Sequence, residues 1–357
     1  MQFIKDQEDG TPEIIRVVPE DAAIVIETEN FVSLLRNFNN KNQFKFEFAG
    51  IKDWDALFGC AELIDSIIRV NKGLDNLLEG EKVIISGHIS ANNQLEFLYV
   101  FQLENEKRLE IIKQAINKLG DSTVSIRKRL YENENLFDVS YSKSDEESSF
   151  TYTVADGIFI FSKSKILTEA AVRRLKTGFS LITNEGFRKI SETAGKNANL
   201  NIYINYRNFP YTFKNLLSDR QESFYDFFRG FASWTELDMV YKDDAFLMSG
   251  YTFVDDSLNQ YLNSFKGQDA LNNDFLSALP GNTASFIAFN FSDPKKWKSS
   301  YNEYLQRKGD FARRNQKLQQ ISSKYRKDVQ DLFFDNIEGA VCAVWMNKIL
   351  RPENRKL

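Results

Sequence analysis

Short apolar runs rich in β-branched and aromatic residues alternate along the chain with stretches in which apolar residues recur every three or four positions. The first pattern predicts strands and the second predicts amphipathic helices. Most of the predicted strands follow one another through tight turns, and the Asp156-Gly157 step is the strongest hairpin signal. We therefore expect an α+β protein with a predominantly antiparallel sheet and with helices packed on one side of it.

Turn and capping residues define the bounds of these elements. The predicted strands cover residues 23–28, 83–89, 95–101, 125–131, 136–141, 149–154, 158–161, 200–206, 235–241, 246–253 and 340–346. The predicted helices cover residues 53–71, 105–119, 164–178 and 184–194, and aromatic helical turns are expected over 209–228.

One phrase of the sequence recurs late in the chain. Residues 18–26 align with 279–287 at an offset of 261, and in both an apolar residue and a proline precede a polar turn and a strand. A Glu-Gly step then leads into the predicted strands at 83–89 and 340–346. This predicts a partial internal repeat. The expected organisation is a polar tether over 1–16, a first α+β unit over 17–278, and the start of a second unit, cut short, over 279–357.

Aromatic residues gather between positions 203 and 234, in a chain with 31 Phe and 14 Tyr. Near-helical spacing of this kind is typical of a helix packed on a sheet. An exposed aromatic patch would instead be a binding surface for a protein, a peptide or a glycan. The candidate surface consists of Phe209, Tyr211, Phe213, Phe224, Tyr225, Phe228 and Phe231.

Charge is distributed unevenly, although the chain as a whole is only slightly acidic at −4. Residues 295–328 carry 11 basic and 3 acidic side chains, which leaves −12 on the remainder. Apolar residues at seven-residue intervals, from Tyr304 to Leu332, predict one long helix with a basic exterior. The candidate basic face consists of Lys295, Lys296, Lys298, Arg307, Lys308, Arg313, Arg314 and Lys317.

Three partners suit this basic helix over 295–327. It would dock on the acidic body of its own chain, on an anionic membrane surface, or on nucleic acid. The acidic remainder of the chain disfavours nucleic acid, so we expect an intramolecular role or contact between repeats.

Groups for side-chain chemistry are scarce. His88 is the single histidine, and Cys60 and Cys342 form neither a zinc-binding motif nor a disulfide framework. Ser86 and His88 share one face of a predicted strand, where side chains two residues apart point in parallel and seldom meet well. No nucleotide-binding or hydrolase motif occurs. We therefore predict no catalytic, metal or cofactor residue.

Paired carboxylates leave one enzymatic alternative open. If two such groups met in a cleft, they would suit a carboxylate-dependent hydrolase or a calcium site. Most of them stand at turns or helix starts, where they cap backbone N–H groups. The pairs are Asp53 with Asp55, Glu146 with Glu147, Asp243 with Asp244, and Asp255 with Asp256.

The phrase Val-Pro-Glu-Asp-Ala-Ala over 18–23, the helix around Trp54 and the hairpin containing His88 resemble a family of uncharacterised, Bacteroidota-like bacterial envelope proteins. Proteins of that family have an N-terminal membrane anchor, a long extracytoplasmic region and a domain of unknown function. The resemblance implies a location in the periplasm or on the cell surface, an anchor preceding this chain, and no particular activity.

The residues themselves contain no signal peptide and no apolar run near 18 residues. The scarcity of reactive groups favours a non-enzymatic binding or scaffolding protein that needs no cofactor, and the resemblance implies that it belongs to the cell envelope. Its expected partner is another envelope protein or the rest of its own chain.

Overall fold

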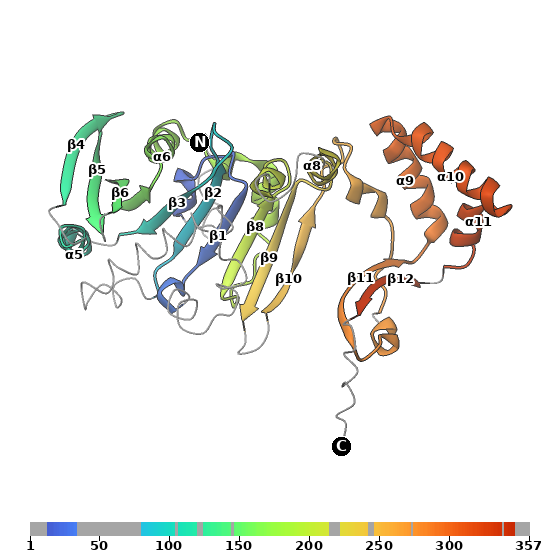
Figure 1. Ribbon diagram of the computed structural model, residues 1–357. Coiled ribbons are helices and arrows are strands. Elements are labelled where there is room, and N and C mark those ends of the chain that lie inside the picture. Colours follow the sequence, from blue (N-terminus) through green and yellow to red (C-terminus); the bar gives the residue numbers. More distant parts are fainter. Residues whose placement is uncertain are drawn as a thin grey trace, which may run out of the picture. The chain divides into compact units, whose positions relative to one another are not determined.

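The computed structural model describes residues 13–33, 80–103, 106–119, 124–143, 146–213, 222–241, 246–272, 274–337 and 339–346. The chain divides into two compact units, unit 1 (Met1–Val254) and unit 2 (Asp255–Leu357) (Figure 1). This division falls earlier than position 278, where the sequence analysis expects it. The reason is that a 3₁₀ helix at the start of unit 2 packs on the first α-helix of that unit through Tyr261, Tyr301 and Tyr304.

Unit 1 is built on an antiparallel sheet of ten strands in the order β10-β9-β8-β1-β2-β3-β7-β6-β5-β4. The strands are β1 (Ile24–Thr28), β2 (Val83–Ile89), β3 (Leu95–Gln102), β4 (Ser125–Tyr131), β5 (Glu134–Lys143), β6 (Glu146–Ala155), β7 (Ile158–Ser162), β8 (Leu200–Asn205), β9 (Trp234–Tyr241) and β10 (Phe246–Phe253). The described helices are η1 (Glu13–Val17), α5 (Glu106–Ile116), α6 (Lys165–Thr177), η2 (Leu181–Thr183), α7 (Glu185–Ser191), η3 (Phe209–Phe213) and α8 (Glu222–Arg229). The predicted α+β class with an antiparallel sheet is confirmed.

Strand β1 lies in the middle of the sheet although it comes first in the sequence. Its Val25 is opposite Ser86 of β2 on one side and Tyr203 of β8 on the other. β8 brings β9 and β10 to one edge of the sheet. On the other side, β3 pairs with β7, and the meander β7-β6-β5-β4 ends at the opposite edge.

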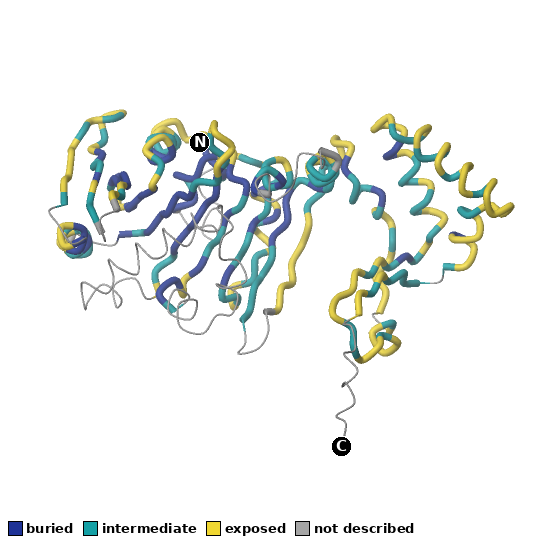
Figure 2. Tube along the Cα trace, in the orientation of Figure 1, coloured by how far each residue is buried: buried dark blue, intermediate teal, exposed yellow. Residues whose placement is uncertain are grey.

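Helices cover both faces of the sheet. On one face, Tyr99 and Phe161 belong to a core cluster that includes Ile112 and Ile116 of α5. On the other face, Ile84 packs in a cluster with α6 and α7. The prediction that helices pack on one side is therefore wrong. The middle strands are buried on both faces, as the dark blue tube of Figure 2 shows, because both of their faces carry apolar side chains.

The turn between β6 and β7 and the two ends of α6 lie where the local sequence predicts them. Asp156 and Gly157 both have positive φ, 51° and 74°, as the turn between β6 and β7 requires. Helix α6 begins after Ser164, whose hydroxyl accepts from the amide of Leu167 at 3.4 Å, and it ends at Gly178 with φ 72°.

The segment assigned to a polar tether is folded at its last residues. Glu13–Val17 forms η1, and its Ile14 and Ile15 are each only 1% exposed. Both side chains pack in the same core cluster as α6 and α7. Residues 13–16 therefore belong to the core of unit 1, and residues 1–12 lie outside the described part of the chain.

Unit 2 combines a two-stranded antiparallel sheet with a group of helices. Its elements are η5 (Tyr261–Phe265), η6 (Asp274–Ala278), β11 (Thr283–Phe291), α9 (Pro294–Lys308), α10 (Phe311–Tyr325), α11 (Val329–Phe334) and β12 (Gly339–Met346). The basic segment is two helices rather than the one long helix predicted, because Gly309 adopts φ 82° and ends α9.

Several predictions fall on residues outside the described ranges. These are the helix over 53–71 with Trp54 and Cys60, the pairs Asp53 with Asp55 and Asp243 with Asp244, and the side chains of Phe213 and Glu146.

Candidate binding surfaces

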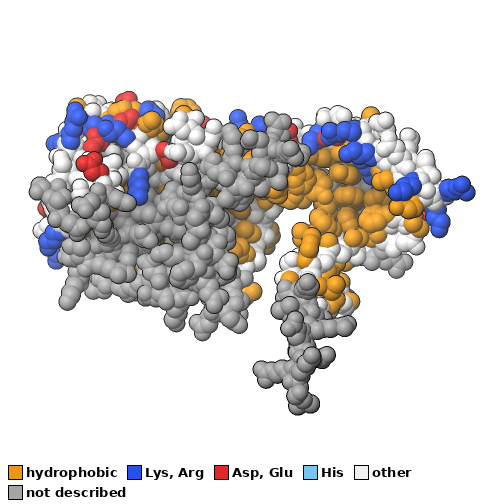
Figure 3. All heavy atoms as spheres, viewed as in Figure 1, with side chains coloured by type: hydrophobic (Ala, Val, Ile, Leu, Met, Phe, Trp, Pro, Cys, Tyr) orange, Lys and Arg blue, Asp and Glu red, His pale blue; other side chains and the backbone are white. Residues whose placement is uncertain are grey.

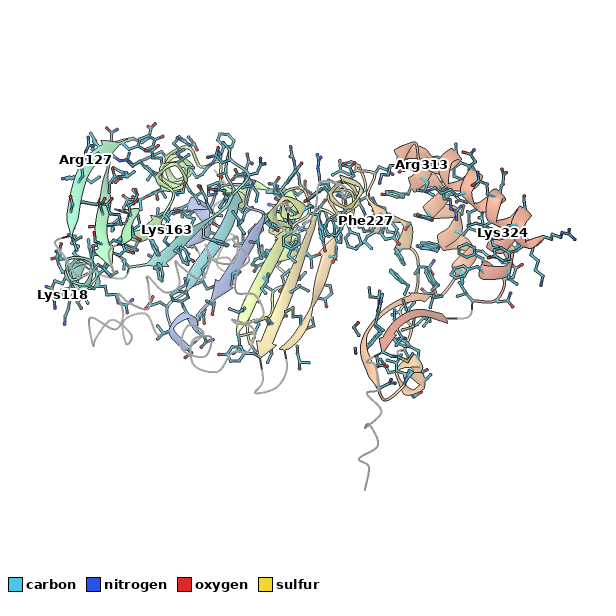
Figure 4. All side chains as sticks on the ribbon, in the orientation of Figure 1. Lys118, Arg127, Lys163, Phe227, Arg313 and Lys324 are labelled. Atoms are coloured by element: carbon cyan, nitrogen blue, oxygen red, sulfur yellow. The ribbon has the colours of Figure 1, made fainter. Side chains whose placement is uncertain are left out.

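The aromatic residues of η3 and α8, which connect β8 to β9, form one cluster. Tyr211 stacks on Tyr225 with ring centroids 6.3 Å apart, and Phe224 lies 4.5 Å from Phe228. Phe228 in turn lies 6.0 Å from Phe231. These side chains, and that of Phe209 on η3, are half-buried. Much of their apolar surface is therefore buried by contacts within the cluster. Figure 4 marks its place in α8 at Phe227.

The candidate basic face runs over α9 and α10, and the acidic residues of unit 2 meet part of it. The Lys295 ammonium lies 3.1 Å from the carboxylate of Asp335, and that of Lys298 lies 3.5 Å from Asp331. Lys296 donates to the carbonyl of Gly267 instead. The last residues of α11 thus sit beside the first turns of α9.

The second half of the basic face is arranged around one carboxylate, that of Asp310. Arg313 pairs with it at 2.7 Å, and Lys308 lies 3.7 Å from it. Arg314 donates to amide oxygens and lies over the ring of Tyr301 at 5.7 Å. Arg307 and Lys317 have no ion pair within the described part of unit 2. This internal pairing favours a role for the face in unit 2 itself.

The most exposed apolar strand of unit 1 is β10, which sequence reasoning did not single out. Its Leu247, Met248 and Tyr251 are 51%, 55% and 64% exposed. β10 stands at the edge of the sheet, with β9 as its one strand neighbour among the described residues. Leu247 and Met248 are adjacent and therefore point to opposite faces of the strand. This adjacent apolar pair is the sequence feature that could have predicted the exposure of β10.

Strand β4, at the other edge, differs in its chemistry. Its sequence Ser-Ile-Arg-Lys-Arg-Leu-Tyr places three basic residues in a row. Arg127 and Lys128 are exposed, and Arg129 binds Asp138 and Glu169 at 3.0 and 2.7 Å. Figure 4 shows Arg127 on this strand. Charged side chains on an edge strand oppose pairing with a further strand.

The sheet of unit 2 also exposes apolar side chains. On β11, Phe286, Ile287 and Phe289 are 42%, 52% and 42% exposed, and on β12, Trp345 and Met346 are 53% and 60% exposed. In Figure 3 hydrophobic side chains gather over unit 2, whereas several Lys, Arg, Asp and Glu side chains lie at the β4 end of unit 1.

Three polar residues form a hydrogen-bonded array beside β1. The Nδ1 atom of His88 lies 3.1 Å from a carboxylate oxygen of Asp21, and its Nε2 atom lies 2.9 Å from the hydroxyl of Ser86. The expectation that Ser86 and His88 seldom meet well is wrong. The hydrogen bond from His88 lowers the pKa of the Asp21 carboxyl, and burial opposes this effect.

The order of this array resembles a hydrolase triad, but its burial is reversed. The hydroxyl of a serine nucleophile must reach the substrate. Here Ser86 is 0% and His88 is 3% exposed, whereas the Asp21 side chain is 66% exposed. The array therefore holds the turn before β1 on strand β2 and offers no accessible nucleophile.

A second polar group, formed by Glu236 and Asp238, lies on the face of the sheet that packs on α7. Glu236 is fully buried, and neither of its carboxylate oxygens has a hydrogen bond of normal geometry. Burial, followed by the neighbouring Asp238, raises its pKa to about 8. Asp238 accepts from the amide of Gly195 and from the side-chain amide of Asn201, both at 2.7 Å. The signal for Glu236 was its position on the same strand face as Trp234.

Of the paired carboxylates proposed for a hydrolase, Asp255 and Asp256 have structural contacts. Asp255 accepts from the amide and hydroxyl of Ser257 at 2.8 and 2.7 Å, as turn-capping residues do. Asp256 forms an ion pair with Lys266. Cys342 is a free, half-buried residue on β12.

Two further findings concern metals and membranes. Within the described ranges, no cluster of three or more His, Cys, Asp and Glu side chains is arranged to hold a metal ion. Across the same residues, no helix combines the length and apolar composition needed to span a membrane.

Comparison with family models, with curated proteins and with solved structures finds no match to this chain.

Proposed function

We propose that this chain is a non-enzymatic binding or scaffolding protein of the bacterial cell envelope, and that the sheet of unit 2 is its main docking surface. The observation that carries the proposal is the exposure of apolar side chains on both faces of β11 and β12. Phe286 and Ile287 are neighbours and point to opposite faces, and both are more than 40% exposed. Contiguous exposed apolar surface of this kind marks interaction sites.

The proposal includes the internal repeat, and matching turns support it. In unit 1 the amide of Val18 donates to the carbonyl three residues earlier at 3.0 Å, and that of Ala22 donates to Pro19 at 3.2 Å. The same two hydrogen bonds occur 261 positions later, from Leu279 at 3.3 Å and from Thr283 at 3.0 Å. A five-residue 3₁₀ helix, η1 or η6, ends two residues before the proline in both.

The strands after these turns pair in the same way. β1 pairs with β2, and β11 pairs with β12, both antiparallel. Gly80 and Gly339, at the Glu-Gly steps, both have positive φ, 77° and 82°. Unit 2 is thus proposed to begin the architecture that unit 1 carries further.

What covers the corresponding strands in unit 1 suggests what unit 2 binds. There, β8 and β3 flank the β1–β2 pair, and the helical layers cover both of its faces. We propose that another envelope protein covers β11 and β12. The family resemblance supports an extracytoplasmic location for this contact.

Photo-crosslinking in cells tests the proposal. A photoreactive amino acid replaces Ile287 on β11, and a control chain carries it at Arg307, an exposed residue of α9. We expect a discrete adduct in the envelope fraction from position 287, and we expect Phe289→Lys to abolish it. Equal adducts from both positions, or none from either, would refute the docking surface.

A further inference from the structure

The two edge strands of the ten-stranded sheet, β4 and β10, differ in their charge. β4 carries three consecutive basic residues, whereas β10 reads Phe-Leu-Met-Ser-Gly-Tyr-Thr-Phe and contains no charged residue and no proline. Charge and proline are the usual means by which proteins prevent an edge strand from pairing. Among the described residues β10 has no strand neighbour beyond β9, and its own sequence has no feature that opposes pairing with a further strand.

The geometry of β10 fits strand pairing. All eight of its residues pair with β9 in an unbroken register, from Phe246 opposite Tyr241 to Phe253 opposite Trp234. With no register shift along its length, β10 presents a regular outer row of backbone N–H and C=O groups to a neighbour. The four residues 247–250 and Tyr251 are all exposed.

We propose that β10 is a self-association edge, and that it pairs antiparallel with β10 of a second copy of this chain. Because β10 has no charge and exposes Leu247, Met248 and Tyr251, an uncharged apolar strand suits it best, and β10 is itself such a strand. Two identical strands related by a twofold axis form an isologous contact, the commonest symmetry of soluble oligomers. The product is one continuous sheet across two copies.

The side chains suit a register centred on Ser249. In that register Tyr251 of one copy lies opposite Leu247 of the other, an aromatic and aliphatic cross-strand pair. Met248 lies opposite Gly250, which has no side chain. Gly250 has to remain glycine because a Cβ there would meet the carbonyl oxygen of Glu236 at 1.9 Å. The exposed side chain of Met248 therefore has space beside the partner strand.

In this register seven residues of each strand, 246–252, are paired. Because this interface is small, the dimer is expected to be weak, with a dissociation constant on the order of 10 µM. Sedimentation velocity of the full chain from about 1 to about 300 µM measures it. Ser249→Lys places like charges opposite each other at the twofold axis, so it should weaken dimerisation at least about tenfold. Leu130→Lys is the matched control, because Leu130 is 68% exposed on the other edge strand, β4. It should leave the dissociation constant unchanged.

A covalent trap keeps the test valid if Ser249→Lys perturbs folding. In a chain whose native cysteines are replaced by serine, Ser249→Cys should form an intermolecular disulfide on mild oxidation faster than Leu130→Cys does. A wild-type chain that stays monomeric over the whole range would overturn self-pairing. So would a dimer that Ser249→Lys leaves equally tight, or equal rates of disulfide formation at the two positions.

Discussion

The strand pair β1–β2 of unit 1 and the pair β11–β12 of unit 2 follow the same turn and have opposite surroundings. Val25 of β1 is 0% exposed, whereas Phe286, 261 positions later, is 42% exposed although it is the larger apolar residue. β1 has β2 and β8 beside it, and β11 has only β12 among the described residues. Apolar composition therefore does not decide burial in this chain; the neighbouring strands and helices do.

The largest expected effect compares two apolar positions that the proposed repeat aligns. Ile15 of η1 is 1% exposed, and Leu276 of η6, its counterpart at the same offset, is 49% exposed. Ile15→Ala should lower the free energy of unfolding of unit 1 by about 3 kcal/mol, because it leaves a cavity in the core. Leu276→Ala should cost unit 2 no more than about 0.5 kcal/mol. Urea unfolding measures both, and similar costs would show that η6 is packed as η1 is.

The next effect concerns the buried carboxyl of Glu236 in the core of unit 1. Its pKa is raised from 4.5 to about 8 in the fold, so the folded state holds a proton that the unfolded state has lost between these values. Stability should therefore fall as pH rises from about 4.5 to about 8, and level off above that. Glu236→Gln should remove this slope and stabilise the chain by roughly 1–3 kcal/mol at pH 8.

Urea unfolding at a series of pH values measures the slope. Glu192→Gln, at the exposed end of α7, is the control and should leave it in place. A slope that Glu236→Gln does not change would mean that another group carries the pH dependence.

Replacing the glycine that ends a helix should destabilise both units equally, because the penalty arises in the local backbone. Gly178 ends α6 in unit 1 and Gly309 ends α9 in unit 2, with φ 72° and 82° and with open space around both. Alanine at either position should cost about 1 kcal/mol, since only the left-handed backbone is penalised. Unfolding of the two variants in parallel tests this, and a cost confined to one unit would contradict it.

The smallest effect is expected at Asp21, whose side chain is largely exposed. Because its pKa is lowered in the fold, its stabilising contribution is present at neutral pH and is lost as the pH falls below the ordinary value of 3.8. Asp21→Asn should cost about 0.5 kcal/mol at pH 7, because the Asp21 side chain is largely exposed, and nothing in strong acid. If the cost persisted unchanged at pH 2, it would not come from the charge of the Asp21 carboxylate.

Local features of the fold could be predicted from the sequence. The strands of the meander, the turn at Asp156 and Gly157, and the ends of α6 at Ser164 and Gly178 depend on side-chain periodicity and on backbone preferences over a few residues. The structure confirms each of them.

Features that depend on distant pairing could not be predicted in the same way. The pairing of β8 with β1 joins segments that lie more than 170 residues apart in the sequence, as in Ile24 opposite Ile204. The contact between His88 and Asp21 depends on the pairing of β1 with β2. The exposure of Leu247 on β10 becomes visible only once the strand order places β10 at an edge.

Native-state hydrogen exchange of the full chain tests most directly whether the sheet of unit 2 is uncovered. Peptides from β1 and β2 should exchange only with global unfolding of unit 1, because both strands are flanked and buried. Peptides from β11 and β12 should exchange at least about a hundredfold faster, through local opening of a two-stranded sheet. Equal protection of the two strand pairs would contradict an open docking surface on unit 2.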